Sequence, residues 1–349
     1  MLAMARAMAV LCAWIGHVLG PCSVTREILS ASEPVALNPT APAARPLSAR
    51  ARLQRLMRHG GPRVAGRTAI LLLCLPPALL LFTLMVALPM SEAAWYSVFR
   101  WNGYGHPTDF VGLRNFRLLL DNSAFHTALI NNGLIILVSL AVQLPLALGL
   151  AVLLADRLRG TNVYRLIFFL PYILAEIAAG LMWRFIYDGD TGLLARIWTA
   201  FGAVPPQLLG EPDLAMYAIL VVVVWKYFGF HMVLYIAGLQ QIDKSLYEAA
   251  RMDGASAWQL FRLITVPLLG STIRLTVFFS VLGSFQLFDL IMPLTKGGPS
   301  DSTQTMVSFL YNYGVTRMQI GFGSAVGVVL FAISVGFAFG YKRLAMRGD

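Results

Sequence analysis

The chain has 349 residues, of which 58% are hydrophobic and only 13% charged, and its formal net charge is +10. Soluble globular domains carry about 25% charged residues and about 45–50% apolar ones, so this composition excludes a soluble globular protein, a disordered chain and a nucleic-acid-binding domain. The three cysteines, Cys12, Cys22 and Cys74, lack the spacing of a metal site and form no disulfide framework. Because helices satisfy their own backbone hydrogen bonds in lipid, the sequence predicts an all-α integral membrane protein.

Residues 1–67 form an N-terminal extension before the first predicted span. Their beginning is similar to a signal peptide, since an apolar run follows one arginine. Residues 21–48 are rich in Ala, Pro and Ser and are predicted to be disordered. Alternatively, translation starts later, and Met57 is a natural candidate start. The extension is basic near the membrane, and we assign it no function.

Six apolar stretches are long enough to cross a bilayer, because about 20 helical residues span its hydrocarbon core. They comprise residues 68–90, 129–155, 163–187, 214–238, 273–294 and 322–341. Together they predict a six-span domain over residues 68–345.

Lysine and arginine are concentrated before the first span, in the second and fourth connections, and after the last span. Basic loops remain on the cytoplasmic side, so both termini are predicted to be cytoplasmic. The connections 91–128, 188–213 and 295–321, which hold most of the loop acids, are then external. The net charge therefore indicates topology, and no nucleic-acid partner is expected.

The fourth connection, residues 239–272, carries the local signals of a helix, a glycine turn and a second helix. Asp243 is a predicted N-cap of the first helix, and Gly254 supplies the positive φ that ends it. Ser256 is the predicted N-cap of the second helix, which Pro267 would stop at the entry to the next span. We therefore expect a helix–turn–helix unit at the membrane surface.

A patch of small residues lies on this loop, where Ala249, Ala250 and Ala255 accompany Glu248 and Arg251. Small side chains let another backbone approach closely, and flanking charges fix its register. The patch therefore suits docking into a groove of a partner protein. Residue types alone favour an ordinary amphipathic pair of interfacial helices equally.

The string from Glu248 to Ser256, Glu-Ala-Ala-Arg-Met-Asp-Gly-Ala-Ser, resembles the EAA loop of bacterial ABC-importer permeases of the sugar and glycerol-phosphate type, which belong to binding-protein-dependent transport systems. In that family the loop is the coupling helix that seats in the cytoplasmic ATPase subunit. The resemblance implies ATPase-coupling roles for Glu248, Ala249, Ala250, Arg251, Asp253, Gly254, Ala255 and Ser256.

Further segments resemble the same family in the same order along the chain. They are residues 111–116, Asn131-Asn132, 238–242, 288–291 and 294–299. The resemblance runs from the first span to the C-terminus and omits the N-terminal extension.

Motifs for catalysis are absent from the sequence. There is no Gly-x-x-x-x-Gly-Lys-[Ser/Thr] phosphate loop, and the five histidines are scattered without acidic or cysteine partners. We therefore expect a transport subunit and not an enzyme. It would bind no cofactor or metal of its own, and ATP and Mg²⁺ would be held by a separate ATPase subunit.

Polar side chains inside spans are costly and are therefore candidates for function. Amides, carboxylates and aromatic rings suit the hydroxyls and faces of a sugar, so a substrate pathway is predicted from Asn131, Gln143, Glu176, Tyr235, Gln286 and Asp289. Each has a structural alternative, such as pairing of Glu176 with a cation on an adjacent helix. Lys226, also within a span, could snorkel to the interface.

The resemblance implies a multi-pass permease subunit of the bacterial inner membrane that moves a carbohydrate-like solute in an ATP-driven ABC importer. Its implied partners are ABC ATPase subunits, a second homologous permease, an extracytoplasmic solute-binding protein and membrane lipid. Sugars, oligosaccharides and glycerol phosphate all remain open as solutes. Two rivals are an ion-gradient-driven secondary transporter, suggested by the acids within spans, and a non-transport scaffold or membrane enzyme.

Overall fold

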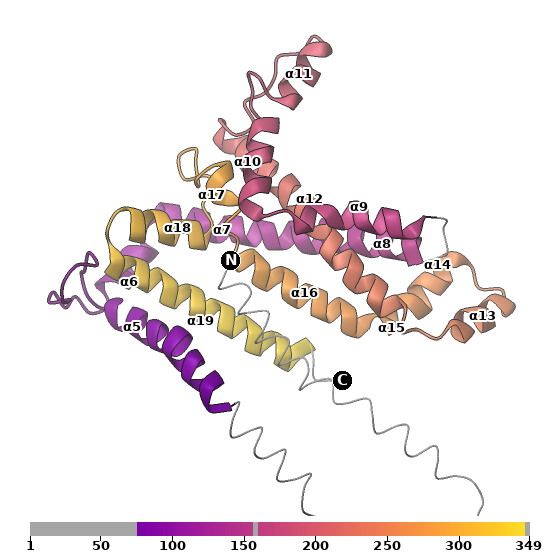
Figure 1. Ribbon diagram of the computed structural model, residues 1–349, viewed down its shortest axis with the longest axis horizontal. Helices are drawn as coiled ribbons and strands as arrows, with labels where there is room; N and C mark the ends of the chain where they lie inside the picture. The colour runs from indigo at the N-terminus through magenta and orange to yellow at the C-terminus, as the bar shows by residue number, and fades with distance from the viewer. Residues whose placement is uncertain (1–74, 156–159, 346–349) are drawn as a thin grey trace, which may run out of the picture. The chain divides into compact units, whose positions relative to one another are not determined.

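The computed structural model describes residues 75–155 and 160–345, and the account below concerns the compact unit Pro77–Asp349 within that range. These residues form helices joined by loops (Figure 1) and contain no β-strand, although Phe99 and Phe110 form an isolated antiparallel bridge. The all-α prediction is confirmed. The predicted extension 1–67 lies outside the described residues.

The helices follow one another along the chain, and η denotes a π-helical turn. The first long helix, Leu75–Tyr96, contains η2 (Thr83–Ala87) and α5 (Leu88–Tyr96). The later elements are α6 (Arg114–Leu120), α7 (Ser123–Val138), η3 (Ser139–Gln143), α8 (Leu144–Ala155), α9 (Thr161–Ile173), α10 (Glu176–Ile186), α11 (Leu193–Ala200), α12 (Pro212–Leu239), α13 (Lys244–Met252), α14 (Ala257–Leu260), η4 (Phe261–Thr265), α15 (Val266–Leu268), α16 (Gly270–Phe285), α17 (Ile291–Leu294), α18 (Met306–Phe309), η5 (Leu310–Thr316) and α19 (Ile320–Ala345).

Four helices of the described chain are long and apolar enough to cross a membrane, and the first, second, fourth and sixth predicted spans coincide with them. They are Leu75–Tyr96, Ser123–Ala155, Pro212–Leu239 and Ile320–Ala345. The third predicted span coincides with one bent helix pair, and the fifth overlaps the second helix of another. The described residues therefore provide four spans, or up to six if each bent pair is one span.

The predicted span over residues 163–187 is not one continuous helix. It is broken between α9 and α10, whose directions differ by 94°. Leu174 and Ala175 between them are extended, with ψ of 140° and 136°. Both halves are similarly apolar, so the hydropathy of the sequence does not reveal the break.

The fifth predicted span also differs from the observed helix. α16 ends at Phe285, so Gln286 and Asp289 lie in the non-helical link to α17 and not inside a span helix. On its other side, α16 is bent by 69° against the helical stretch Ala257–Leu268. That stretch ends at Leu268, one residue after Pro267, so the predicted stop at this proline is confirmed to within one residue.

Prolines explain three of the four π-helical turns in the described residues, and η5 is the exception. Pro89, Pro145 and Pro267 each lie two residues beyond the last residue of η2, η3 and η4. Because proline has no N–H, the carbonyl four residues before it loses its usual donor, and the widened turn accommodates the ring. After Pro267 the helical stretch extends only to Leu268 before the bend to α16.

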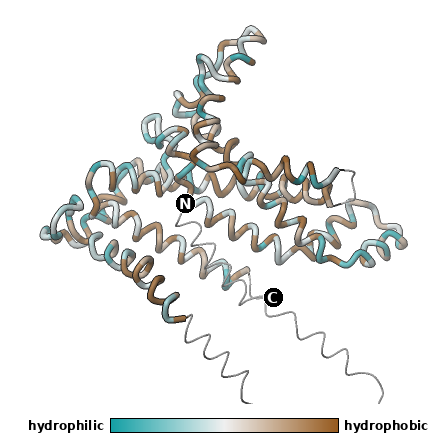
Figure 2. Tube along the Cα trace, viewed as in Figure 1, coloured by the Kyte–Doolittle hydropathy of each residue, from teal (hydrophilic) through white to brown (hydrophobic). Residues whose placement is uncertain are grey.

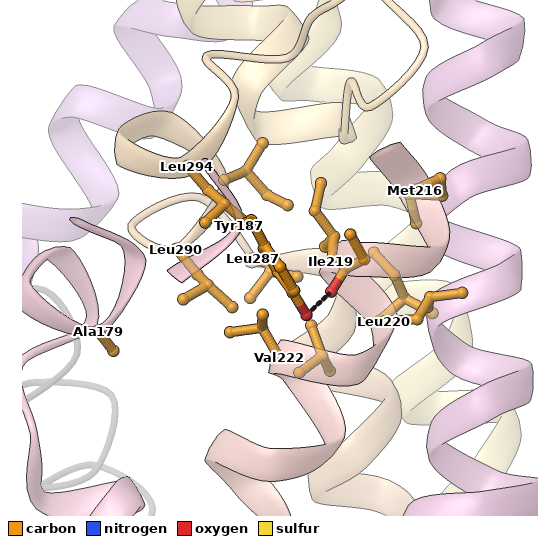
Figure 3. Packing of buried hydrophobic residues seen from close by; sticks show 13 residues of the cluster. Ala179, Tyr187, Met216, Ile219, Leu220, Val222, Leu287, Leu290 and Leu294 are labelled. Atoms are coloured by element: carbon orange, nitrogen blue, oxygen red, sulfur yellow. Dashed lines mark hydrogen bonds between the residues drawn. The ribbon is translucent and has the colours of Figure 1, made fainter. Parts of the chain in front are cut away.

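α12 is the most buried of the four long apolar helices. In its most apolar stretch 61% of the residues are buried, against 0% in that of Leu75–Tyr96. It packs against α8, α9 and α16. Its N-terminal half contributes to a buried cluster (Figure 3) in which the hydroxyl of Tyr187 donates to the carbonyl of Ala218 at 3.1 Å. α12 is therefore the central helix of the unit.

Hydrophilic residues gather towards the ends of the long helices (Figure 2). At one end α13 and α14 lie together, and α6 and α18 lie at the opposite end (Figure 1). The connection predicted to be cytoplasmic is thus well separated from those predicted to be external.

Candidate functional site

α13 begins where Asp243 caps it, as predicted. The Asp243 carboxylate accepts a hydrogen bond from the backbone N–H of Ser245 at 2.9 Å, and such a bond satisfies a donor left free at a helix N-terminus. The backbone and side-chain bonds from Ser245 lower the pKa of Asp243, because they stabilise its charged form. The helix start is therefore fixed by an ionised side chain.

α13 ends in a Schellman motif centred on Gly254, whose φ of +81° confirms the predicted left-handed turn. The N–H of Ala255 donates to the carbonyl of Ala250 at 2.9 Å, and the N–H of Gly254 donates to the carbonyl of Arg251 at 3.1 Å. These two bonds define the motif. The second alanine of the Glu-Ala-Ala string therefore closes the turn through its backbone.

α14 begins with a capping box, which confirms Ser256 as its N-cap. The Ser256 hydroxyl accepts from the N–H of Gln259 at 3.3 Å, and the Gln259 side chain accepts from the N–H of Ser256 at 2.7 Å. Tyr247 on α13 and Thr265 on η4 share a further hydrogen bond at 3.0 Å. The caps and this cross-link hold α13 against the stretch that follows α14.

The predicted coupling residues lie on the surface of this helix pair, and α13 has no buried residue. Ala250 and Ala255 are half-buried, whereas the exposed members are Glu248, Ala249, Arg251, Asp253, Gly254 and Ser256. Met252 and Trp258 beside them are 87% and 65% exposed. Large apolar side chains exposed together are typical of a surface that binds a partner.

Three of the six predicted pathway residues are buried. Asn131, Gln143 and Tyr235 are at most 5% exposed. The side-chain nitrogen of Asn131 donates to the carbonyls of Ser302 and Gln304, at 2.7 and 2.9 Å. Both amide hydrogens of Asn131 are thus used to hold the loop between α17 and α18.

Gln143 and Tyr235 make contacts of the same kind. The Gln143 side-chain nitrogen lies 3.0 Å from Nδ1 of His231, and the hydroxyls of Tyr235 and Thr276 are 2.8 Å apart. The first contact joins η3 to α12 and the second joins α12 to α16. Both side chains are therefore placed as links between helices.

The other three predicted pathway residues are accessible. Gln286 is exposed, and Glu176 and Asp289 are half-buried. Glu176 accepts a hydrogen bond from the hydroxyl of Tyr227 at 2.9 Å and interacts electrostatically with Asp289 and Lys226. A carboxylate in contact with lipid is costly, so an aqueous pathway or a partner chain is the favourable surrounding for these acids.

Sequence reasoning missed the position of Lys226. It does not snorkel: it is 1% exposed, in the middle of α12. Its ammonium donates to the carbonyls of Pro171 at 2.8 Å, Tyr172 at 3.1 Å and Leu174. A lysine inside an apolar span was a visible signal, but its partners lie over 50 residues away in sequence.

The family model described as the inner membrane component of binding-protein-dependent transport systems matches residues 62–347. The chain belongs to this family. Its relatives include the probable ABC transporter permease protein YurN of Bacillus subtilis, 34% identical over 79% of this chain and 96% of that protein. They also include the sn-glycerol-3-phosphate transport system permease protein UgpA of Agrobacterium fabrum, 33% identical over 79% of this chain and 94% of that protein.

Solved structures share the fold. A chain from the crystal structure of a bacterial ABC transporter involved in the import of alginate matches with a TM-score of 0.73 and 19% identity, covering 85% of this chain and 99% of that chain. A chain from the alginate transporter in complex with its pentasaccharide-bound periplasmic protein gives a TM-score of 0.71 at 20% identity, over 85% and 98% of the two chains.

Membership of the family establishes the class of protein. The chain is a multi-pass permease subunit of the inner membrane, as the Glu-Ala-Ala string predicted, and it is a transport subunit and not an enzyme. The scaffold and membrane-enzyme alternatives are thereby set aside.

Proposed function

We propose that the chain is the permease of an ATP-driven ABC importer that takes a carbohydrate-like solute from an extracytoplasmic binding protein into the cytoplasm. The names of its relatives support this class of solute: besides sn-glycerol 3-phosphate transport, they include diacetylchitobiose uptake and trehalose/maltose transport. ATP hydrolysis takes place on a separate ATPase subunit, and this chain binds no cofactor or metal.

The observation that carries the proposal is the surface of α13, Gly254 and α14. This helix pair is held internally by two caps and a Schellman motif, yet no residue of α13 is fully buried. A rigid, exposed unit of this kind is suited to transmit force from a partner. The ATPase subunit docks here, on Glu248, Ala249, Ala250, Arg251, Asp253, Gly254, Ala255 and Ser256.

The solute pathway runs beside the break between α9 and α10. Glu176, Gln286 and Asp289 supply accessible acceptors and donors for sugar hydroxyls. Asn131, Gln143 and Tyr235 serve the same pathway indirectly, because they fix the helices and the loop that line it.

Two further partners complete the importer. A second, homologous permease lies against this one in the membrane, and apolar side chains exposed along Leu75–Tyr96 are available for lipid and for that contact. The solute-binding protein docks on the external connections 91–128, 188–213 and 295–321.

Two measurements test the energy source. An ATPase subunit expressed with the tagged chain is expected to co-purify with it in detergent, and uptake by cells that express the whole importer is expected to cease on ATP depletion. Uptake that survives ATP depletion but collapses with an uncoupler would instead establish the ion-gradient-driven alternative.

A further inference from the structure

The break between α9 and α10 leaves the last carbonyls of α9 without partners from their own helix, because Leu174 and Ala175 are extended. In a membrane such groups need a partner from elsewhere in the protein. Lys226 of α12 supplies it: its Nζ lies 2.8 Å from the carbonyl of Pro171 and 3.1 Å from that of Tyr172, and it also donates to Leu174.

All the donor hydrogens of the Lys226 ammonium are used by these carbonyls. It has three hydrogens, and three backbone carbonyls accept from it. Since Lys226 is 1% exposed, no solvent and no solute reaches it. Its role is therefore to hold one helix against another and not to bind an anionic solute.

A second contact one turn away keeps the same two helices together. A Cβ atom at Gly229 would overlap the carbonyl oxygen of Phe168, so the backbones of α12 and α9 approach each other there more closely than any other residue would permit. The rings of Phe168 and Phe228 meet edge to face beside it, with centroids 5.9 Å apart. α9 is thus attached to α12 both along its length and at its broken end.

α12 also leads directly to the coupling loop. It ends at Leu239, and α13 begins at Lys244 after a short turn. Lys226 lies 13 residues before Leu239, which is about 20 Å of helix at 1.5 Å per residue. One continuous helix therefore joins the docking surface to the middle of the broken span.

We propose that Lys226 is a positioning residue for transport: it ties the break at Leu174–Ala175 to α12, so that movement of α13 and α14 is carried to the solute pathway beside Glu176. This inference rests on the proposed function. Without the ammonium, α12 would still move with the ATPase, but the broken span would no longer follow it.

The test reports movement at the break without knowledge of the solute. Cys12, Cys22 and Cys74 are replaced by serine, and Ala175, which is exposed, is replaced by cysteine. The permease is purified with its ATPase subunits in membrane vesicles, and the rate of labelling by a hydrophilic maleimide is measured without nucleotide and with ATP and vanadate. In this parent protein, which keeps Lys226, ATP and vanadate are expected to change the labelling rate of the cysteine at position 175.

In the Lys226→Met background, ATPase assembly and basal ATP hydrolysis are expected to persist. The nucleotide-dependent change in labelling is expected to shrink by roughly two- to thirty-fold, the range over which single residues modulate coupling. Lys226→Gln keeps two of the three donor hydrogens, so its nucleotide-dependent change in labelling is expected to lie between those of the parent and of Lys226→Met. Lys226→Gln also serves as the test variant if Lys226→Met does not accumulate in membranes.

Tyr341→Phe is the matched control, because it removes a 2.8 Å bond from a side chain to the carbonyl of Arg274 between two other helices, α19 and α16. It is expected to label like the parent. A full nucleotide response in Lys226→Met, or in Lys226→Gln where only that variant accumulates, would overturn the inference. Failure of the ATPase to co-purify with the parent itself would instead contradict the proposed function.

Discussion

The side chain of Asn131 donates a hydrogen bond to the carbonyl of Gln304 at 2.9 Å, although 173 residues separate them in sequence. Its neighbour Asn132 accepts from the N–H of Met306 at 2.9 Å and donates to the carbonyl of Ser284 at 2.6 Å. The Asn-Asn pair of α7 is thus connected through these amides to α16 and to the segment that leads into α18. The pair fixes the loop that follows α17 to α7.

Replacing Asn131 with alanine is expected to destabilise the permease by about 1–3 kcal/mol, because buried carbonyls lose their donors. Thermal unfolding in detergent measures the loss. Asn102→Ala, which removes an exposed amide, is expected to leave the unfolding temperature unchanged. If both variants unfold alike at the parent temperature, the Asn131 amide does not hold the loop.

Gly254 gives a prediction that separates backbone strain from crowding. Nothing lies within 4 Å of a Cβ at this position, so only its φ of +81° disfavours another residue. Gly254→Ala is expected to weaken the turn by about 1–2 kcal/mol, and Gly254→Asn by less, because asparagine visits left-handed conformations more readily. Gly254→Asp adds a charge at the docking surface.

Uptake and ATPase co-purification are expected to decline in the order Gly, Asn, Ala, with Gly254→Asp uncoupling transport while membrane insertion persists. An alanine variant as active as the parent would show that the left-handed turn is not needed for coupling.

The start of α13 is expected to depend on pH. The folded-state pKa of Asp243 is lowered by the bonds from Ser245, so the cap contributes stability above the ordinary aspartate pKa of about 3.9, and that contribution is lost as the pH falls through the lowered folded value. Hydrogen-exchange protection of the Ser245 amide should therefore fall at acid pH. Asp243→Asn keeps a capping oxygen, so protection of the Ser245 amide in this variant should not change over the same pH range. If the parent and Asp243→Asn lose protection equally, the Asp243 carboxylate is not the group whose protonation weakens the cap.

Close helix packing at Gly229 is tested by adding one methyl group. Gly229→Ala places a Cβ against the carbonyl of Phe168 and is expected to cost about 1–3 kcal/mol, as overpacking does. Gly133→Ala in α7 meets nothing within 4 Å and is expected to be neutral or stabilising, because alanine favours helix. Unfolding temperatures that rank the two variants the other way would show that α9 and α12 are not in close contact.

Local signals in the sequence were sufficient to predict the caps and the turn of α13 and α14. Asp243, Gly254 and Ser256 each act on backbone groups within a few residues, so their caps and turn could be predicted without knowledge of the fold. The break after α9 could not be predicted, because the group that satisfies its free carbonyls is an ammonium from another helix. Lys226 lies 52 to 55 residues away from the carbonyls it satisfies.

The surroundings of the predicted pathway residues were harder to predict than the caps of α13 and α14, for a related reason. A buried amide such as Asn131 can be satisfied by a solute or by a distant backbone, and residue type does not distinguish the two. Only the fold shows that Asn131 is used internally whereas Gln286 is exposed. The end of α16 at Phe285 was likewise hidden by the apolar residues that continue beyond it.

The central claim is that α13 and α14 form the ATPase docking surface, and a charge reversal tests it most directly. The tagged permease is co-expressed with its ATPase subunit, and the ATPase retained per permease is measured for Glu248→Lys and for Glu211→Lys, another exposed acid, on a connection predicted to be external. Glu248→Lys is expected to lose most of the ATPase while Glu211→Lys retains the parent amount. Full retention by Glu248→Lys, or equal loss in both variants, would contradict the account.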